Sequence, residues 1–288
     1  MDKQPSLKIY GLVGYPAKHS LSPLMHNAAF KALKINAKYL LFEKRPQDLE
    51  NFLHSLTKEN IYGLNITIPY KEKILDFVTL DKEFFYLRQI KAVNTIVLEN
   101  GIWKGFNTDI PGFSKDLKEN IDPTNKRVAI LGAGGGARAV AYVLANAGAR
   151  EISIYDIDKK KSKEAASMIK SLFVNFRISP VDNIEQLDIN QKDLLINATP
   201  IGLKGTDPCL IKEEMLPKDL FVYDLIYNPA QTKLLSLAKK RGIRTSNGLK
   251  MLLYQGMLSF RIWTNKDAPQ EVMWQAIRRE LKDAGYNN

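Results

Sequence analysis

The sequence predicts a two-domain α/β protein, with an N-terminal α/β domain followed by a Rossmann-type, doubly wound domain. Short apolar runs alternate with longer amphipathic ones along the chain, which is typical of parallel strands joined by crossover helices. The length of 288 residues fits two domains, or one large one, at roughly 100 to 200 residues per domain. An apolar run, Val128–Leu131, leads into a glycine-rich segment at Gly132, as the first strand of a doubly wound domain does.

The first half of the chain predicts strands at Ile9–Val13 and Gly63–Ile68. Between them, Leu24–Leu33 carries apolar residues at helical spacing. This segment follows Ser22-Pro23, and proline near the first helical position favours a helix start. We therefore expect a strand, a helix and a second strand in this order.

A β-hairpin and a domain boundary follow. The segments Asn94–Leu98 and Ile102–Phe106 flank Asn100-Gly101, the dipeptide that best accommodates positive φ at both positions of a two-residue turn. The hairpin ends before a polar stretch, Lys118–Lys126, and a fresh strand follows that stretch. We expect the boundary between the domains within Ile110–Lys126.

The second half predicts four more strands and two helices. The strands are Val128–Leu131, Glu151–Tyr155, Asp193–Ile196 and Leu220–Asp224, and the helices are Pro229–Lys240 and Met251–Trp263. We expect residues 1–109 and 248–288 to form one domain, to which the C-terminal helices return. Residues 110–247 would form the Rossmann-type domain.

Composition excludes several classes of protein. Hydrophobic residues make up 45% and charged residues 25% of the chain, so intrinsic disorder is not its dominant state. Cys209 is the only cysteine, so the chain forms no internal disulfide and no cysteine-based metal site. We expect no bound metal and a cytoplasmic location. No window approaches ~18 consecutive apolar residues, so we expect no membrane span.

The charge balance invites a nucleic-acid interpretation, which the motifs do not support. Lys and Arg number 42 against 31 Asp and Glu, a formal net charge of +11. No basic helix with groove-reading side chains and no aromatic stacking motif accompanies this charge. We expect no nucleic-acid partner and interpret the charge as a property that aids solubility and steers anionic ligands.

The glycine-rich segment has the form G-x-G-x-x-A of the dinucleotide fingerprint. It comprises Gly132, Ala133, Gly134, Gly135, Gly136 and Ala137. In this pattern the first glycine permits a tight turn, the second lets the backbone approach a pyrophosphate, and the alanine allows close packing of helix on strand. The amide donors of the following helix N-terminus favour phosphate. An empty structural turn is the alternative.

The choice between NAD and NADP depends on the residues after Glu151–Tyr155. Asp156 lies 24 positions after Gly132, near the ~20 expected of a ribose-binding acid. Asp158 adds a second carboxylate, and two carboxylates repel a 2′-phosphate. Lys159–Lys161 follows at once, as a solvated helix start or as a phosphate ligand. We expect NAD to be preferred, with NADP as the alternative.

Three segments of the first half are rich in short polar residues next to glycine or proline. They are Ser20–Pro23, Asn65–Lys71, and Asn94-Thr95 followed by Asn107–Asp109. Ordinary turn and cap chemistry explains any one of them alone. Polar groups at strand ends also line the ligand sites of open α/β sheets, so together they predict a substrate site.

Together with the glycine loop, these segments resemble the shikimate dehydrogenase family, in chain order through nearly the whole sequence. The motifs are Ser20-x-Ser22-Pro23, Asn65-x-Thr67-x-Pro69-x-Lys71, Ala92-Val93-Asn94-Thr95, Gly105-x-Asn107-Thr108-Asp109, the glycine loop, Asn197-Ala198-Thr199-Pro200-x-Gly202, Asp224-x-x-Tyr227-x-Pro229 and Asn247-Gly248-x-x-Met251-Leu252-x-x-Gln255.

The resemblance implies hydride transfer between a nicotinamide and the 3-position of shikimate or 3-dehydroshikimate, in chorismate and aromatic amino acid biosynthesis. It places proton transfer on Lys71, with Asp109 as its partner carboxylate. It also implies a set of binding residues. Ser20, Ser22 and Tyr227 match residues at the substrate carboxylate, and Asn65, Thr67, Asn94 and Gln255 match residues at the ring hydroxyls. On the cofactor side the matches are Thr199, Leu225, Gly248 and Met251, of which Met251 fits core filling almost as well.

Two departures from the family pattern bear on the branch. Asp156-Ile157-Asp158 stands where the NADP-specific branch typically has Asn-Arg-Thr, which resembles the NAD-preferring quinate/shikimate dehydrogenases. Lys91 stands where the family usually has glycine. A catabolic quinate role and a catalytically weak sensor of substrate or cofactor are the alternatives, and a monomer and a homodimer are both compatible with the sequence.

Overall fold

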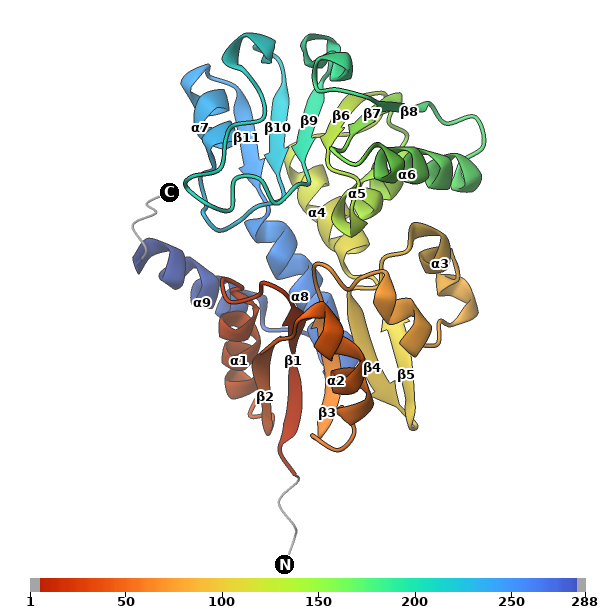
Figure 1. The fold of residues 1–288 in the computed structure, drawn as a ribbon. Helices are drawn as coiled ribbons and strands as arrows, with labels where there is room; N and C mark the ends of the chain where they lie inside the picture. The colour runs from red at the N-terminus through yellow and green to blue at the C-terminus, as the bar shows by residue number, and fades with distance from the viewer. Residues whose placement is uncertain (1–5, 284–288) are drawn as a thin grey trace, which may run out of the picture. The chain divides into compact units, whose positions relative to one another are not determined.

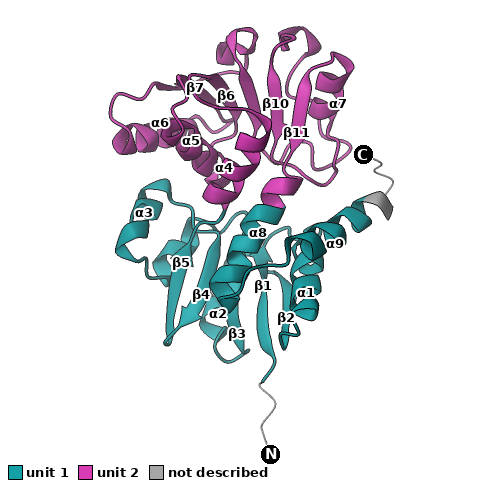
Figure 2. Cartoon of the chain, turned by 180° about the vertical axis from the view of Figure 1, so that it is seen from behind, with its two compact units in different colours: residues 1–108, 253–288 teal, residues 109–252 magenta. Residues whose placement is uncertain are grey.

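The computed structural model describes residues 6–283 and divides into two compact units (Figure 1). Unit 1 comprises residues 1–108 and 253–288, and unit 2 comprises residues 109–252 (Figure 2). The stretch expected to hold the boundary, Ile110–Lys126, is largely helical instead, because α4 spans Asp109–Asn120. Phe113 and Leu117 lie one turn apart on this helix, and both are fully buried.

Unit 1 is built on a five-stranded mixed sheet of order β2-β1-β3-β4-β5. Its strands are β1 (Lys8–Gly14), β2 (Ala37–Glu43), β3 (Ile61–Ile66), β4 (Thr95–Glu99) and β5 (Ile102–Phe106). The first three run parallel, and β4 and β5 add an antiparallel hairpin. Asn100 and Gly101 adopt φ of 50° and 80°, which confirms the hairpin expected from this dipeptide.

The helices of unit 1 come from both ends of the chain. They are α1 (Ser22–Ala32), α2 (Leu49–Ser55), α3 (Tyr86–Ile90) and α9 (Gln270–Asp283), with short 3₁₀ turns at Pro46–Asp48, Lys73–Phe77 and Lys82–Phe84. Helix α8 (Leu249–Thr264) belongs to both units, because the division falls between Leu252 and Leu253. On its unit 1 side, Trp263 donates a hydrogen bond to the carbonyl of Ile96 at 3.0 Å and stacks on Tyr10.

On both edge strands of this sheet, outward-facing backbone groups form hydrogen bonds with other residues of unit 1. On β2, the Asn27 amide of α1 donates to the carbonyl of Tyr39 at 3.0 Å and accepts from its N–H at 2.8 Å. On β5, Thr79 forms an isolated bridge with Lys104. The Thr79 N–H donates to the carbonyl of Trp103 at 2.8 Å, and the N–H of Gly105 donates to the carbonyl of Thr79 at 3.0 Å.

Unit 2 is built on a six-stranded sheet of order β11-β10-β9-β6-β7-β8, in which every pair is parallel. Its strands are β6 (Arg127–Leu131), β7 (Glu151–Tyr155), β8 (Ile178–Val181), β9 (Leu194–Asn197), β10 (Phe221–Asp224) and β11 (Arg244–Asn247). Counted from β6, this is the doubly wound order 3-2-1-4-5-6, whose direction reverses between β6 and β9. The predicted fold class is confirmed.

The helices of unit 2 besides α4 are α5 (Gly135–Asn146), α6 (Lys159–Leu172) and α7 (Lys233–Lys240), with 3₁₀ turns at Glu185–Leu187, Ile189–Gln191 and Glu213–Met215. The predicted helix Pro229–Lys240 starts too early, because α7 begins four residues later, at Lys233. The hydroxyl of Thr232 accepts a hydrogen bond from the N–H of Leu235, so Thr232 is the helix cap.

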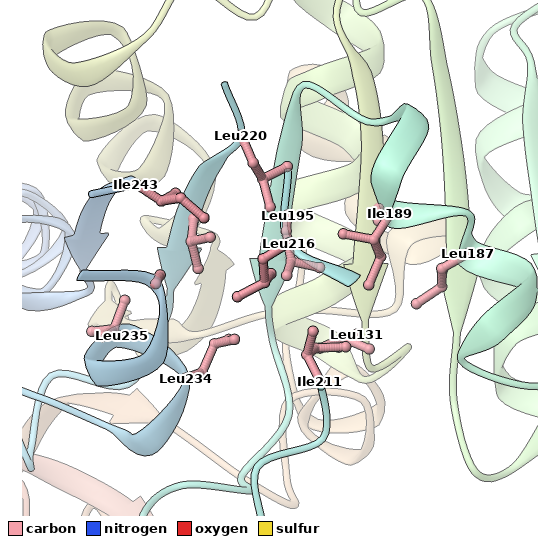
Figure 3. Close-up of a cluster of buried hydrophobic side chains, with 13 residues drawn as sticks. Leu131, Leu187, Ile189, Leu195, Ile211, Leu216, Leu220, Leu234, Leu235 and Ile243 are labelled. Carbon is pink, nitrogen blue, oxygen red and sulfur yellow. The ribbon is translucent and has the colours of Figure 1, made fainter. Parts of the chain in front are cut away.

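One face of the unit 2 sheet is covered by a cluster of buried aliphatic side chains (Figure 3). Leu131 of β6, Leu195 of β9 and Val222 of β10 contribute from the sheet, and Leu234 and Leu235 contribute from α7. Every residue of β9 and β10 is buried, so these strands are covered on both faces and read as apolar runs in the sequence. This core fixes the carboxyl ends of the strands, where the loops of interest begin.

No helix within residues 6–283 is both long and apolar enough to cross a membrane.

Candidate functional site

In unit 1, the predicted substrate residues gather at one end of the sheet. Ser20 and Ser22 follow β1, and Thr67 and Lys71 follow β3. Because β4 is antiparallel, its first residue Thr95 pairs with Asn65 near the end of β3 and with Phe106 at the end of β5. This pairing brings Asn94 and the segment after β5 to the same end. A mixed sheet thereby collects residues that are far apart in sequence.

Backbone hydrogen bonds join the loops at this end. The N–H of Thr67 donates to the carbonyl of Val13 at 3.0 Å, and the N–H of Tyr15 donates to the carbonyl of Ile68 at 3.0 Å. The carbonyl of Lys71 accepts from the N–H of Val93 at 3.0 Å. These bonds tie the loop that carries Lys71 to the segment before β4.

The predicted serine pair lies at the start of α1. Ser22 is the first residue of the helix and is 3% exposed, and Pro23 follows it in the first turn. The Ser20 hydroxyl oxygen accepts a hydrogen bond from the N–H of Ser22 at 3.2 Å. The N–H groups of this turn already donate to Ser20 and Leu21, so the two hydroxyls are the groups that could donate to an anion.

Asn65, Asn94 and Gln255 belong to one buried polar network in unit 1. Asn65 donates to the hydroxyls of Thr95 at 3.0 Å and Ser259 at 2.9 Å. Asn94 donates to the hydroxyl of Thr108 at 3.0 Å, and that hydroxyl donates to Gln255 Oε1 at 3.3 Å. The network also contains Tyr39, whose hydroxyl donates to Asn65 Oδ1 at 2.8 Å.

Sequence analysis missed four members of this network. Thr95 and Thr108 stand inside the quoted motifs, directly beside Asn94 and Asp109, and that adjacency was the available signal. Ser259 lies four residues after Gln255 on α8, a spacing that places two side chains on one helix face. Tyr39 lies in a strand that sequence analysis did not predict, so no signal pointed to it.

In unit 2, the glycine loop lies at the point where the strand order reverses. Gly132 has a φ of +95°, and a Cβ there would lie 2.9 Å from the carbonyl oxygen of Ala198 in the loop after β9. Glycine is therefore required at this position by both conformation and packing. Ala137, in α5, is fully buried, as close packing of helix on strand requires.

Gly134 has no such requirement. Its backbone is extended, and a Cβ there would meet no atom within 4 Å. A side chain at this position would therefore project into open space beside the start of α5. Together with the Gly135–Gly136 start of the helix, this opening fits the close approach of a pyrophosphate to the backbone.

Asp156 holds the glycine loop in place. One carboxylate oxygen accepts from the N–H of Ala133 at 2.7 Å, and the other accepts from the N–H of Asp158 at 2.9 Å. Asp158 caps α6 by accepting from the N–H of Lys160 at 3.0 Å. Both carboxylates thus lie beside the loop at the end of β7.

The lysines after Asp158 are exposed and pair with carboxylates. Lys159 lies 3.2 Å from Asp182, and Lys161 lies 4.0 Å from Asp158. Lys160 lies 4.0 Å from Glu164 along α6. The interpretation of this run as a solvated helix start agrees with these contacts.

A buried carboxylate organises the loops after β9 and β10. Asp224 accepts from Thr232 at 2.7 Å and from the Asn197 amide at 3.0 Å, and the other end of that amide accepts from the Thr199 hydroxyl at 2.7 Å. Burial raises the pKa of Asp224 to about 6, against the opposing effect of these hydrogen bonds. Through Asn197, Asp224 therefore fixes the position of Thr199, a predicted cofactor residue.

The remaining predicted residues of unit 2 lie on the segments that follow β10 and β11, except Asp109. Leu225 and Tyr227 follow β10, and Gly248 follows β11 and precedes α8, which carries Met251. A Cβ on Gly248 would lie 2.1 Å from the carbonyl oxygen of Leu225, so the backbone approach requires glycine. Asp109 is the first residue of α4 and is 6% exposed.

The strand order, the glycine loop at the reversal point and the polar sheet end of unit 1 define a two-unit α/β protein of the dinucleotide-binding class. Comparison with known proteins identifies the family. A model described as the shikimate dehydrogenase substrate binding domain matches residues 12–96, and one described as the shikimate 5′-dehydrogenase C-terminal domain matches residues 248–278.

Similar proteins match over nearly the full length. A protein of Caldanaerobacter subterraneus subsp. tengcongensis named shikimate dehydrogenase (NADP(+)) is 40% identical over 282 residues, which is 95% of this chain and 98% of that protein. The crystal structure of Aquifex aeolicus shikimate dehydrogenase matches with a TM-score of 0.86 and 35% identity, covering 96% of this chain and 99% of that one. Listeria monocytogenes shikimate 5-dehydrogenase, crystallised with shikimate and NAD, matches with a TM-score of 0.82 and 32% identity, covering 96% and 98%.

The chain therefore belongs to the shikimate dehydrogenase family of oxidoreductases. The finer expectation, membership of the NAD-preferring quinate/shikimate branch, finds no support in the relative from Caldanaerobacter, whose name specifies NADP(+).

Proposed function

We propose that this protein catalyses the reversible interconversion of 3-dehydroshikimate and shikimate with a nicotinamide dinucleotide. The observation that carries the proposal is the set of family motifs, which supplies polar residues to one end of the unit 1 sheet and a glycine loop to unit 2. Similarity to shikimate dehydrogenases over 95% of the chain supports the same reaction.

On this proposal, the Lys71 ammonium donates a proton to the oxygen at the 3-position during ketone reduction and accepts it back during oxidation. Asp109 holds the ammonium and accepts a hydrogen bond from the reacting hydroxyl. Ser20, Ser22 and Tyr227 bind the substrate carboxylate, and Thr67, Asn94 and Gln255 bind ring hydroxyls. Directional bonds of this kind reject analogues that lack a hydroxyl, because buried polar groups are then left unpaired.

The cofactor supplies or accepts the hydride when bound. Residues 132–137 fit its pyrophosphate, because the loop is open at Gly134 and lies at the N-terminus of α5. Thr199, Leu225, Gly248 and Met251 would line the remaining part of the cofactor site. Residues 1–109 and 248–288 would carry the substrate function, and residues 110–247 the cofactor function.

The finer proposal is a preference for NAD over NADP. Asp156 and Asp158 place two carboxylates beside the glycine loop, and the nearby ammonium groups of Lys159 and Lys161 pair with carboxylates. This charge pattern disfavours a 2′-phosphate. The NADP(+) in the name of the Caldanaerobacter relative points the other way, so direct measurement decides between them.

The test is a kinetic matrix of shikimate and quinate against NAD and NADP, followed at the reduced-nicotinamide absorbance. We expect turnover of shikimate and a higher kcat/KM with NAD. In the Lys71→Ala variant, kcat should fall by roughly 10² or more, as expected on removal of a general acid/base. Absence of turnover with both cofactors would contradict the proposed reaction. A kcat/KM that favours NADP would contradict the cofactor preference alone.

A further inference from the structure

Three hydroxyl groups meet in the buried network of unit 1. Thr95 lies 2.9 Å from Ser259, Thr108 lies 3.2 Å from Ser259, and Thr95 lies 3.2 Å from Thr108, measured between hydroxyl oxygens. Thr95 and Ser259 are fully buried, and Thr108 is 2% exposed. We call these three side chains the hydroxyl triad. Its members come from β4, the segment after β5, and α8.

The triad leaves Asn65 little capacity to bind a ligand directly. The amide nitrogen of Asn65 has two protons, and three acceptors lie within reach: Thr95 at 3.0 Å, Ser259 at 2.9 Å and the carbonyl of Asn94 at 3.4 Å. Its oxygen already accepts from Tyr39 at 2.8 Å. The carbonyl of Asn94 can only accept, so the nitrogen end of the Asn65 amide faces the triad and its oxygen faces Tyr39.

The same logic fixes the orientation of Asn94. Its oxygen accepts from the N–H of Thr108 at 2.7 Å, a backbone donor that cannot reverse its role. The Asn94 nitrogen is therefore the end that donates to the Thr108 hydroxyl at 3.0 Å. That hydroxyl has one proton, and two acceptors lie 3.3 Å from its oxygen: Gln255 Oε1 and Asn94 Oδ1, which already accepts the backbone N–H.

Ser259 connects this chain of bonds to α8. Its hydroxyl donates to the carbonyl of Gln255, one turn earlier, at 3.1 Å. With its proton used in this bond, the Ser259 oxygen accepts from Asn65 and from a threonine of the triad. Gln255 is thereby held through its backbone by Ser259 and through its side chain by Thr108.

We propose that Ser259 is a positioning residue, which through the hydroxyl triad fixes the side-chain amides of Asn94 and Gln255 in the one orientation that reads the substrate hydroxyls. Asn65 belongs to the same positioning apparatus and is not a direct ligand. This proposal rests on the proposed function, because it assigns the substrate contacts to Asn94 and Gln255.

Ser259→Ala removes one hydroxyl and adds no bulk, and alanine favours the helix. We expect the KM for shikimate to rise about 3- to 10-fold, the range that corresponds to the net loss of about one hydrogen bond. The kcat should change less than KM, and the KM for the nicotinamide cofactor should stay at the wild-type value. The preference for shikimate over 4-deoxyshikimate should fall, because misoriented amides no longer penalise the missing hydroxyl.

Matched variants separate positioning from packing. Ser259→Cys keeps the approximate volume with a weaker hydrogen-bonding group, so it should behave like Ser259→Ala. Ser162→Ala is the control in unit 2: Ser162 is 1% exposed, and its hydroxyl donates to the backbone carbonyl of Lys159 at 3.1 Å. Its shikimate KM should equal the wild-type value. Thr108→Val combined with Ser259→Ala should give less than the product of the two single effects, because both act through one network.

A measurement without turnover tests the network itself. In wild-type protein, the side-chain NH₂ signals of Asn65 and Asn94 should exchange slowly with solvent, and Ser259→Ala should accelerate their exchange while Ser162→Ala does not. An unchanged KM and unchanged discrimination in Ser259→Ala, with an active wild type, would overturn the positioning role. An inactive wild type with slowly exchanging amides would overturn the proposed function and leave the network established. Rapid exchange in wild-type protein would overturn the network.

Discussion

Among the glycines of the nucleotide loop, the reasons for having no side chain differ from residue to residue. Gly132 is required by its φ of +95° and by contact with Ala198, so its substitution strains the fold. Gly134 is extended and faces open space, so the fold alone tolerates a side chain there. The pyrophosphate proposed to bind here would explain its glycine, because it needs close approach to the backbone.

Gly134→Val should therefore separate binding from stability. We expect the Kd for the nicotinamide dinucleotide to rise at least about 10-fold, because the side chain occupies the space of the pyrophosphate, while stability changes by less than about 1 kcal/mol. Gly205→Val is the matched control, since a Cβ at Gly205 also meets no atom within 4 Å. Cofactor titration and thermal unfolding of both variants check this. Equal Kd values for the two variants would remove Gly134 from the cofactor site.

At the scale of single residues, the motifs predict a role for each residue, and they do not predict partners that are distant in sequence. The structure places Asn65 near the end of β3, where the predicted substrate residues gather. The hydrogen bonds of its side-chain amide involve Tyr39, 26 positions away, and Ser259, 194 positions away. A sequence pattern does not encode such pairings, because the fold alone brings these partners into contact.

At the scale of elements, periodicity and turn chemistry predicted the inner strands and the edge strand β5, and missed the other edge strands. The hairpin at Asn100-Gly101 and strand β7 were correct, because a turn dipeptide and a buried apolar run are local signals. Strands β8 and β11 were missed. They are four residues each, and β8 contains Pro180, which only an edge position tolerates.

Helix α3 ends at an unusual residue. Lys91 is its C-cap, with φ of 54° and ψ of 46°, and its N–H donates to the carbonyl of Leu87. The family usually has glycine here, which reaches this left-handed conformation without steric cost. The departure from the family pattern therefore leaves the backbone of the turn in the left-handed region and adds an exposed ion pair with Glu72 at 3.3 Å.

Lys91→Gly should stabilise the protein by about 0.5–1 kcal/mol, because left-handed conformation costs a non-glycine residue about 1 kcal/mol or more and the greater freedom of unfolded glycine offsets part of the gain. The exposed ion pair contributes little, so its loss matters less. Lys91→Ala loses the ion pair and keeps the strain, so it should not be more stable than wild type. Urea unfolding of the three proteins measures the differences. A glycine variant no more stable than the alanine variant would refute the strain.

At the scale of the whole molecule, the two units bury titratable groups of opposite kind. In unit 1, both ring nitrogens of His26 are buried without a hydrogen-bond partner, and the ring stacks on Tyr39. Burial lowers the pKa of His26 to about 3 from 6.5. In unit 2, burial raises the pKa of Asp224 to about 6 from 3.8.

These shifts have opposite consequences in acid. Between pH 6.5 and 3 the unfolded chain protonates His26 and the folded unit does not, so the contribution of His26 to stability falls by about 1.4 kcal/mol per pH unit. Between pH 6 and 3.8 the folded unit protonates Asp224 first, so its contribution to stability rises as the pH falls. We expect acid to unfold unit 1 before unit 2.

Hydrogen exchange at pH 7, 5.5 and 4.5 measures this order, because it reports the two units separately. His26→Phe should flatten the pH dependence of unit 1, and Asp224→Asn should flatten that of unit 2. Earlier loss of protection in unit 2 at pH 4.5 would show that other groups dominate.

The contacts on the two edge strands of unit 1 also bear on how separate copies of the protein behave at high concentration. An exposed strand edge is a template for pairing with another chain, and long free edges promote aggregation. The Asn27 amide occupies both backbone groups of Tyr39 on β2, and Thr79 occupies the outer side of β5 at Trp103 and Gly105. Each edge is therefore interrupted near its middle, and a second molecule finds no uninterrupted row of donors and acceptors on either side. Resistance to intermolecular strand pairing is thus built into the same sheet whose end carries the predicted substrate residues.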